Sequence, residues 1–211
     1  RTGISFLLRD HKRAFELDNT NTTYMDNVAG AMMDLELYND AIEYFEKIIE
    51  IDSTDYLSYS RIGYIYTYEL ENYNKAIDYY NNALKKLTEN SNSYNQSELN
   101  EELSGVNYEV AYNLYNIYQN NDNNILLDKA LVSVNKSIDL KQNAGLDYGN
   151  DESYNLMGLI YNKQNKFEDA FKSFELANTF SKQKDSEILY NLGRGYWYLE
   201  NNDDAIYYLK K

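Results

Sequence analysis

Apolar residues recur three and four positions apart along most of this sequence, a spacing that places them on one face of an α-helix. The pattern is clearest from Tyr154 to Ala177, where two apolar stripes flank the polar turn Asn165-Lys166. The stripes consist of Tyr154, Met157, Gly158 and Tyr161, then Phe167, Ala170, Phe174 and Ala177. Since Gly158 and Ala170 carry almost no side chain, we expect two amphipathic helices whose axes approach closely there.

Less regular copies of this helix-turn-helix pattern fill the rest of the chain. The small residues Ala29 and Gly63 are 34 positions apart, and Gly158 and Gly193 are 35 positions apart. We expect full copies at 22–55, 56–90 and 151–184, a partial leading copy at 1–21 and a truncated final copy at 186–211. Between them we expect a polar insertion at 91–105 and a divergent copy at 106–145, in which Tyr115 stands where the pattern has a small residue.

The pattern resembles the tetratricopeptide repeat, a unit of about 34 residues with an aromatic residue, Leu-Gly and Tyr in its first helix and Ala and Phe in its second. The resemblance implies an all-α fold, a right-handed α-solenoid of stacked helix-turn-helix repeats over residues 1–211, with a concave groove lined by the first helices. The proline that usually ends the second helix is missing, and the whole chain has none. We therefore expect the second helices to end less sharply. Since the pattern starts and stops inside a copy, we also expect the sequence to be part of a longer repeat array.

The face of each first helix that the packing stripe does not use is expected to line the groove. The predicted groove residues are Asp26, Asp34, Tyr64, Tyr68, Glu109, Tyr112, Asn116, Asn155, Asn162, Tyr190, Arg194 and Trp197. Asparagine both donates to and accepts from a peptide backbone, and Tyr and Trp supply flat contact area at low entropic cost. Tyr and Asn are abundant throughout the chain, however, so composition alone also accounts for their presence.

Charge restricts the partners. The formal net charge is −14 and the pI about 4.5, which disfavours nucleic acid and anionic membrane surfaces. There is no apolar run of 18 residues, so we expect no membrane insertion. Some tetratricopeptide domains clamp a C-terminal carboxylate with basic residues and asparagines, but the matching places here offer Asp26, Ser60, Tyr64, Tyr112 and Asn116, with Arg194 the one arginine. An acidic groove suits a neutral or basic protein or peptide.

Catalytic and metal-binding patterns are weak in this sequence. His11 is the single histidine and cysteine is absent, so we expect no transition-metal site and no catalytic His pair. The acidic segment 147–152 lacks the ligand spacing of a calcium loop. The helix glycines belong to no phosphate-binding loop. We therefore expect no catalytic, cofactor-binding or metal-ligating residues, no cofactor and no enzymatic activity.

Three functional interpretations follow. The leading one is a non-enzymatic scaffold that binds a peptide or helix segment in an acidic groove lined by Tyr and Asn. The alternative is the substrate-recognition arm of a larger enzyme, such as a glycosyltransferase, whose catalytic domain lies outside this chain. End-to-end self-association through apolar stripes at the ends is a third possibility. We expect a cytoplasmic location, although a signal peptide removed earlier is also compatible with the sequence.

Overall fold

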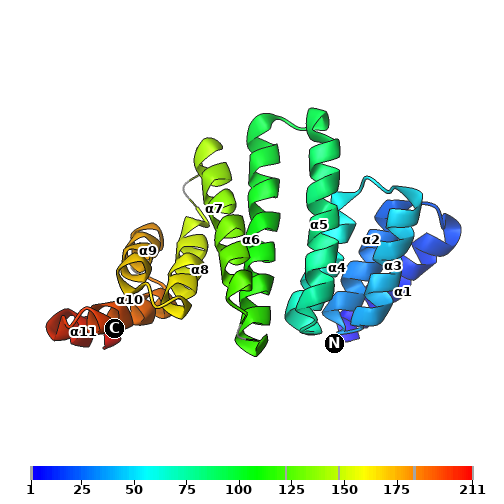
Figure 1. Ribbon diagram of the computed structural model, residues 1–211. Helices are drawn as coiled ribbons and strands as arrows, with labels where there is room; N and C mark the ends of the chain where they lie inside the picture. The colour runs from blue at the N-terminus through cyan, green and yellow to red at the C-terminus, as the bar shows by residue number, and fades with distance from the viewer. Residues whose placement is uncertain (1, 122, 147, 183, 211) are drawn as a thin grey trace. The chain divides into compact units, whose positions relative to one another are not determined.

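The computed structural model describes residues 2–121, 123–146, 148–182 and 184–210 (Figure 1). Asp147, part of the acidic segment considered above, lies outside these ranges. The described residues form helices joined by short turns, with no β-strand among them. The α-helices are α1 (Thr2–Leu17), α2 (Thr22–Asp34), α3 (Tyr38–Ile51), α4 (Tyr56–Tyr64), α5 (Tyr73–Glu89), α6 (Gln96–Asn121), α7 (Asn124–Asn143), α8 (Asn150–Lys163), α9 (Phe167–Phe180), α10 (Ser186–Tyr198) and α11 (Asn202–Leu209). Two short elements complete the set: the π-helical turn η1 (Ile65–Glu69) and the 3₁₀ turn η2 (Ser91–Ser93).

The chain divides into two compact units, residues 1–91 and 92–211. In the first unit α1 packs on α2, the pairs α2–α3 and α4–α5 each form a hairpin, and α3 packs on α4. In the second unit the hairpins are α6–α7, α8–α9 and α10–α11, with α7 packed on α8 and α9 on α10. The predicted all-α solenoid of stacked helix-turn-helix repeats is confirmed.

The predicted apolar stripes form the core. In the first unit they bury one continuous cluster from α2, α3, α4 and η1: Met25, Val28, Ala29, Met32, Ala41, Ile42, Phe45, Ile48, Ile62 and Ile65. In the second unit Ala170 and Phe174 of α9 pack with Leu192 of α10, which joins two neighbouring hairpins. A single helix pair cannot bury its own stripe, so this stacking creates the core.

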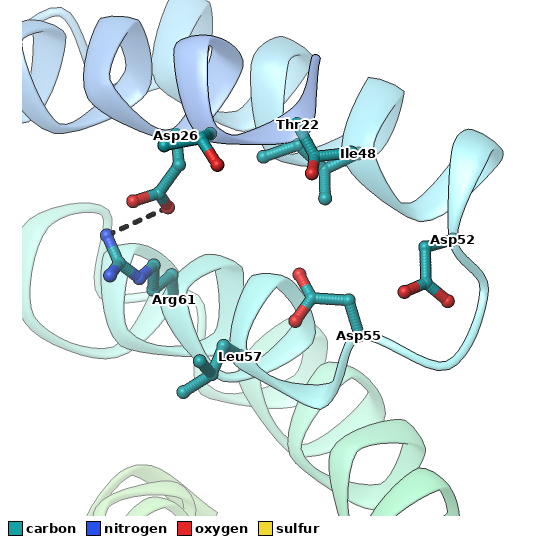
Figure 2. Close-up of a pocket in the computed structure, with 8 residues that line it drawn as sticks. Thr22, Asp26, Ile48, Asp52, Asp55, Leu57 and Arg61 are labelled. Carbon is teal, nitrogen blue, oxygen red and sulfur yellow. Dashed lines mark ion pairs between the residues drawn. The ribbon is translucent and has the colours of Figure 1, made fainter. Parts of the chain in front are cut away.

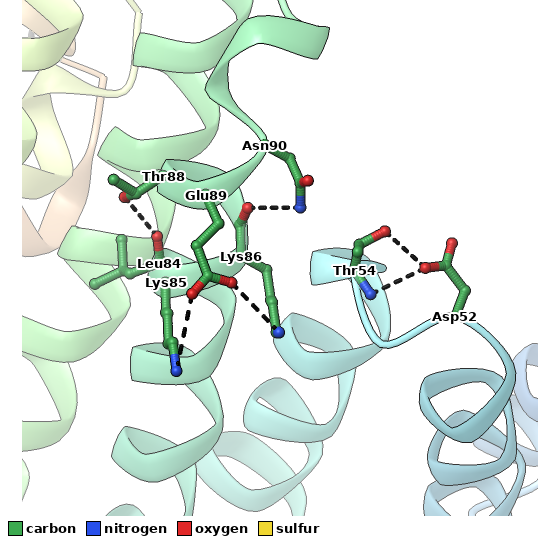
Figure 3. Close-up of polar contacts among 8 residues, drawn as sticks. All are labelled: Asp52, Thr54, Leu84, Lys85, Lys86, Thr88, Glu89 and Asn90. Carbon is green, nitrogen blue, oxygen red and sulfur yellow. Dashed lines mark hydrogen bonds and ion pairs between the residues drawn. The ribbon is translucent and has the colours of Figure 1, made fainter.

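At the C-terminal ends of the second helices of the first unit there are side-chain hydrogen bonds and no proline (Figure 3). After α3, the Asp52 carboxylate accepts hydrogen bonds from the backbone N–H and hydroxyl of Thr54, at 2.9 and 2.6 Å. These bonds lower the pKa of Asp52. At the end of α5, the Asn90 amide donates to the Lys86 carbonyl at 3.0 Å. The first pair closes a turn directly after α3, and the last bond adds a side-chain donor to a carbonyl that already accepts from the Asn90 backbone N–H.

The segment predicted as a polar insertion is partly helical. Its second half forms the first turns of α6, which continues without a break through Tyr115 to Asn121. Tyr115 is buried, although it occupies the position of a small residue. A buried polar contact joins α6 to its partner helix: the Ser104 hydroxyl donates to the Ser137 carbonyl of α7 at 2.8 Å.

Candidate functional site

A cavity of about 270 Å³ opens between the first helices of the second unit. Its wall is built from α6, α8 and the start of α10. The lining residues are Tyr108, Tyr112, Glu152, Asn155, Leu156, Leu159, Asp185, Glu187 and Ile188. Two of the predicted groove residues, Tyr112 and Asn155, therefore lie in one cavity. We call it the α6–α8–α10 cavity.

Asn155 is fixed in this cavity by residues of the next repeat. Its side-chain oxygen accepts a hydrogen bond from the amide of the buried Asn191 at 3.0 Å. Its own amide donates to the Glu187 carboxylate at 3.3 Å. An asparagine side chain has a second N–H and a second lone pair beyond those used in these two bonds. Asn155 is thus held in one orientation with capacity to bind a backbone amide.

Two stacked tyrosines form the α6 side of the cavity. The rings of Tyr108 and Tyr112 are 6.4 Å apart between centroids and inclined by 19°. Burial, and then the charges of Glu152 and Glu109, raise the pKa of Tyr108. Its phenol is consequently neutral at physiological pH. The lining of the cavity thus combines aromatic rings with carboxylates.

Further along α10 lies an aromatic surface outside the cavity. Tyr190 and Trp197 are 54% and 59% exposed. The Arg194 guanidinium lies over the Tyr190 ring, 5.8 Å from its centroid, and its Nη2 is 3.5 Å from the Tyr198 hydroxyl. These contacts are cation–π and hydrogen-bonding interactions within α10 itself, and they leave large exposed aromatic faces.

The remaining predicted residues of the second unit do not line the cavity. Asn116 donates its amide to the Tyr112 carbonyl of its own helix at 3.0 Å. Asn162 has a buried side-chain oxygen without a hydrogen-bond partner among the described residues. Glu109 is half-buried on α6 and its backbone carbonyl accepts from Asn113 at 2.8 Å. The asparagines expected to face a ligand therefore differ in their local roles.

The first unit has a cavity of about 250 Å³ at the corresponding place, between α2 and α4 (Figure 2). Asp26 of α2 and Arg61 of α4 point toward one another across it and form an ion pair of 3.1 Å. Asp55, which also lines this cavity, caps α4 by accepting from the backbone N–H of Ser58 at 3.3 Å. We call this the α2–α4 cavity. Of the predicted groove residues in this unit, only Asp26 lines it.

The other three predicted residues of the first unit lie toward the ends of their helices. Tyr64 and Tyr68 are both exposed, and their rings lie 4.7 Å apart between centroids. Asp34 is exposed at the last residue of α2. The structure thus brings the tyrosines together as a pair and keeps Asp34 apart from the α2–α4 cavity.

Two important residues, Arg61 and Asn191, were missed by the sequence prediction. Each immediately precedes the buried pair, Ile62-Gly63 or Leu192-Gly193, that packs the helix hairpin. Each reaches back to the preceding first helix, where it contacts Asp26 or Asn155. A polar residue directly before the packing pair was the available signal.

The family model of the tetratricopeptide repeat matches this chain at residues 27–55, 56–85 and 151–184. The chain contains tetratricopeptide repeats at these three places. A search of curated protein sequences finds no match. In the described part of the chain, no helix combines the length and apolar character needed to cross a membrane.

Solved tetratricopeptide repeat structures resemble this chain in fold. One is YrrB, described as a TPR protein with an unusual peptide-binding site, with a TM-score of 0.63, 20% identity and coverage of 95% of this chain and 89% of YrrB. BtubC from P. vanneervenii has a TM-score of 0.75, 17% identity and coverage of 99% and 86%. PilF of Pseudomonas aeruginosa has a TM-score of 0.71, 18% identity and coverage of 99% and 82%. At these identities the likeness is one of fold.

Proposed function

We propose that this chain is a non-enzymatic protein-interaction scaffold that binds a peptide or helix segment along the first helices of its second unit. The observation that carries the proposal is the orientation of Asn155. It is held by Asn191 and Glu187 inside an open cavity, with hydrogen-bonding capacity left over. A fixed amide of this kind loses little entropy when it binds a peptide backbone.

Two further features support the proposal. The exposed rings of Tyr190 and Trp197 on α10 offer rigid contact area of the kind enriched at binding surfaces. The peptide-binding site named for YrrB, a protein of the same fold, supports a comparable use of the fold here. The acidic residues around Asn155 favour a neutral or basic segment over nucleic acid.

A capture experiment tests the proposal. The chain is used as bait beside the variant Tyr112→Ala/Tyr190→Ala/Trp197→Ala, and bound proteins are quantified by mass spectrometry. A matched control, Ile125→Ala/Val132→Ala/Leu176→Ala, removes exposed apolar side chains from the second helices α7 and α9. Circular dichroism must first show equal helical content for all three proteins.

We expect the groove variant to lose specific partners by at least tenfold and the control to retain them, because buried aromatic anchors dominate interface energies. Each lost partner is then reduced to its binding segment with synthetic peptides and measured directly with the purified chain. Partners kept equally by the groove variant would contradict the proposal and move binding to another surface.

A further inference from the structure

The first unit shows how a cationic side chain fits between two first helices of this chain. In the α2–α4 cavity, Arg61 places its guanidinium 3.1 Å from the Asp26 carboxylate (Figure 2). Asp26 lies three residues before the small residue Ala29, and Arg61 lies two residues before Gly63. The pair therefore joins equivalent helices of consecutive repeats at fixed repeat positions.

The same repeat positions in the second unit hold two amides. Asn155 lies three residues before Gly158 and Asn191 two residues before Gly193, and the two side chains are hydrogen-bonded at 3.0 Å. The arginine of the first unit therefore has an uncharged counterpart here. The α6–α8–α10 cavity has neither Lys nor Arg in its lining.

Each cavity is lined by three carboxylates, but only the α2–α4 cavity also has a basic residue, and the acidic positions differ. Six residues before the small residue, the first unit has Thr23 and Leu57, whereas the second has Glu152 and Glu187. Acids in the first turn of a helix are favoured by its dipole, but Thr23 and Leu57 show that the fold does not require an acid at this position. Asp185, by contrast, caps α10 by accepting from the backbone N–H of Glu187 at 2.8 Å. Helix capping therefore explains the acidic residue at this position.

From this comparison we infer that the α6–α8–α10 cavity receives a lysine or arginine side chain of the bound segment. This side chain takes the part that Arg61 has in the α2–α4 cavity. The inference rests on the proposed function and names the residue that the groove selects. Glu152 and Glu187 bind the cationic group, and the faces of Tyr108 and Tyr112 take its aliphatic stem and add cation–π attraction.

Size and geometry favour a single side chain over the other occupants. The cavity, about 270 Å³, lies just below the range of small-molecule pockets, roughly 300–1,000 Å³. Across the described ranges, no three acidic or histidine side chains converge closely enough to hold a metal ion. A lining that combines carboxylates with aromatic and apolar side chains suits an elongated organic cation with an apolar stem.

The test uses a phage library of random twelve-residue peptides, selected on the immobilised chain and counter-selected on the Tyr112→Ala/Tyr190→Ala/Trp197→Ala variant. We expect the selected peptides to share one position occupied by Lys or Arg. One such peptide, labelled with a fluorophore, is then titrated by anisotropy with the chain and with Glu152→Gln/Glu187→Gln. Glu168→Gln/Glu175→Gln on α9 is the control, because it removes the same charge from exposed positions of a second helix.

We expect Glu152→Gln/Glu187→Gln to weaken binding at least tenfold, with a smaller dependence on salt, and the control to stay within twofold of the unchanged chain. Replacing the shared Lys or Arg of the peptide by Gln should cause a similar loss, and this loss should largely vanish in the Glu152→Gln/Glu187→Gln variant. The glutamine at 187 can still accept from Asn155, so the cavity keeps its geometry.

Two different failures are distinguishable. Peptides that bind the groove without a shared basic position, or that bind Glu152→Gln/Glu187→Gln as well as the unchanged chain, would overturn this inference and leave the proposed function standing. If the library yields no peptide that depends on the groove aromatics, the proposed function and this inference both fall.

Discussion

Glycines set the closest approach between helices in this chain. A Cβ at Gly158 would lie 2.5 Å from Cε1 of Phe174, and one at Gly63 would lie 2.9 Å from Cε1 of Tyr80. Both aromatic rings belong to the second helix of the same hairpin and are buried. The small residue of one helix and the large residue of the other are therefore a matched pair.

Gly158→Ala should lower the free energy of unfolding by about 1–3 kcal/mol, the usual range for overpacking, because the added methyl group forces the Phe174 ring out of its place. Gly105→Ala is the control in the same unit, since a Cβ there meets nothing within 4 Å. It should raise the free energy of unfolding by roughly 0.5–1 kcal/mol, because alanine is the better helix former. Urea denaturation measures both. Equal effects of the two substitutions would contradict the paired packing.

The spacing of apolar residues predicted which positions are buried, but not always which side chains are in contact. Met25, Val28 and Phe45 are buried as their spacing indicated. Arg61 and Asn191 stand at the border between the packing stripe and the groove face. The neighbouring helix decides which contacts such a side chain makes. The position directly before the packing pair marks such residues in the sequence, but their partners, Asp26 and Asn155, belong to another repeat and are given only by the packed helices.

At the scale of elements, the turns inside four of the hairpins share one backbone conformation. Glu36, Glu71, Asn165 and Glu200 all have positive φ, between 49° and 64°. In the turn after α8, the Lys166 N–H donates to the Tyr161 carbonyl and the Asn165 N–H to the Asn162 carbonyl, at 3.0 and 3.1 Å. Such bonds end a helix on a left-handed residue, a place usually taken by glycine. Glutamate there has an unfavourable Cβ contact.

Glu71→Gly should therefore raise the free energy of unfolding, by about 0.5–1 kcal/mol after the entropic cost of glycine is subtracted. Glu43→Gly, at an exposed position inside α3 of the same unit, should lower it by about 1 kcal/mol. Thermal and urea unfolding of the two variants compare them directly. If Glu71→Gly destabilises as much as Glu43→Gly, the left-handed turn is not strained.

An extra residue in the first unit shows what the sequence leaves undecided about an element. Gly63 and Ala76 are 13 positions apart, whereas Gly158 and Ala170 are 12 apart. The sequence indicated one additional residue in the turn. The structure absorbs it in the π-helical turn η1, where the Leu70 N–H donates to the Ile65 carbonyl at 3.0 Å. Ile65, the first residue of η1, is fully buried in the packed hairpin.

Across the whole molecule, the acidic charge and the 24 tyrosines act together. Burial is the main cause that raises the pKa of most of the shifted tyrosines, and nearby carboxylates add to it. The tyrosines with a raised pKa caused chiefly by burial are Tyr44, Tyr79, Tyr108, Tyr115, Tyr154, Tyr161 and Tyr196. In Tyr38 a hydrogen bond to Glu69 is the chief cause and raises the pKa to about 12. The folded state therefore holds phenolic protons more tightly than the unfolded chain.

This difference predicts that the protein loses stability in alkali. Unfolded tyrosines ionise near pH 10, so above that value the folded state binds more protons and the free energy of unfolding falls as pH rises. The stabilisation is complete below about pH 10 and disappears as pH passes the folded pKa, about 12 for Tyr38. We expect unfolding followed by circular dichroism to coincide with a late, steep rise in phenolate absorbance at 295 nm.

Tyr108→Phe, which removes one of these hydroxyls, should make the loss of stability above pH 10 shallower. The slope of the unfolding free energy against pH reports the number of protons that the folded state retains, so the difference between the variant and the unchanged chain gives the contribution of Tyr108. A single absorbance transition near pH 10 with the helices intact would show instead that water reaches these phenols in the folded protein.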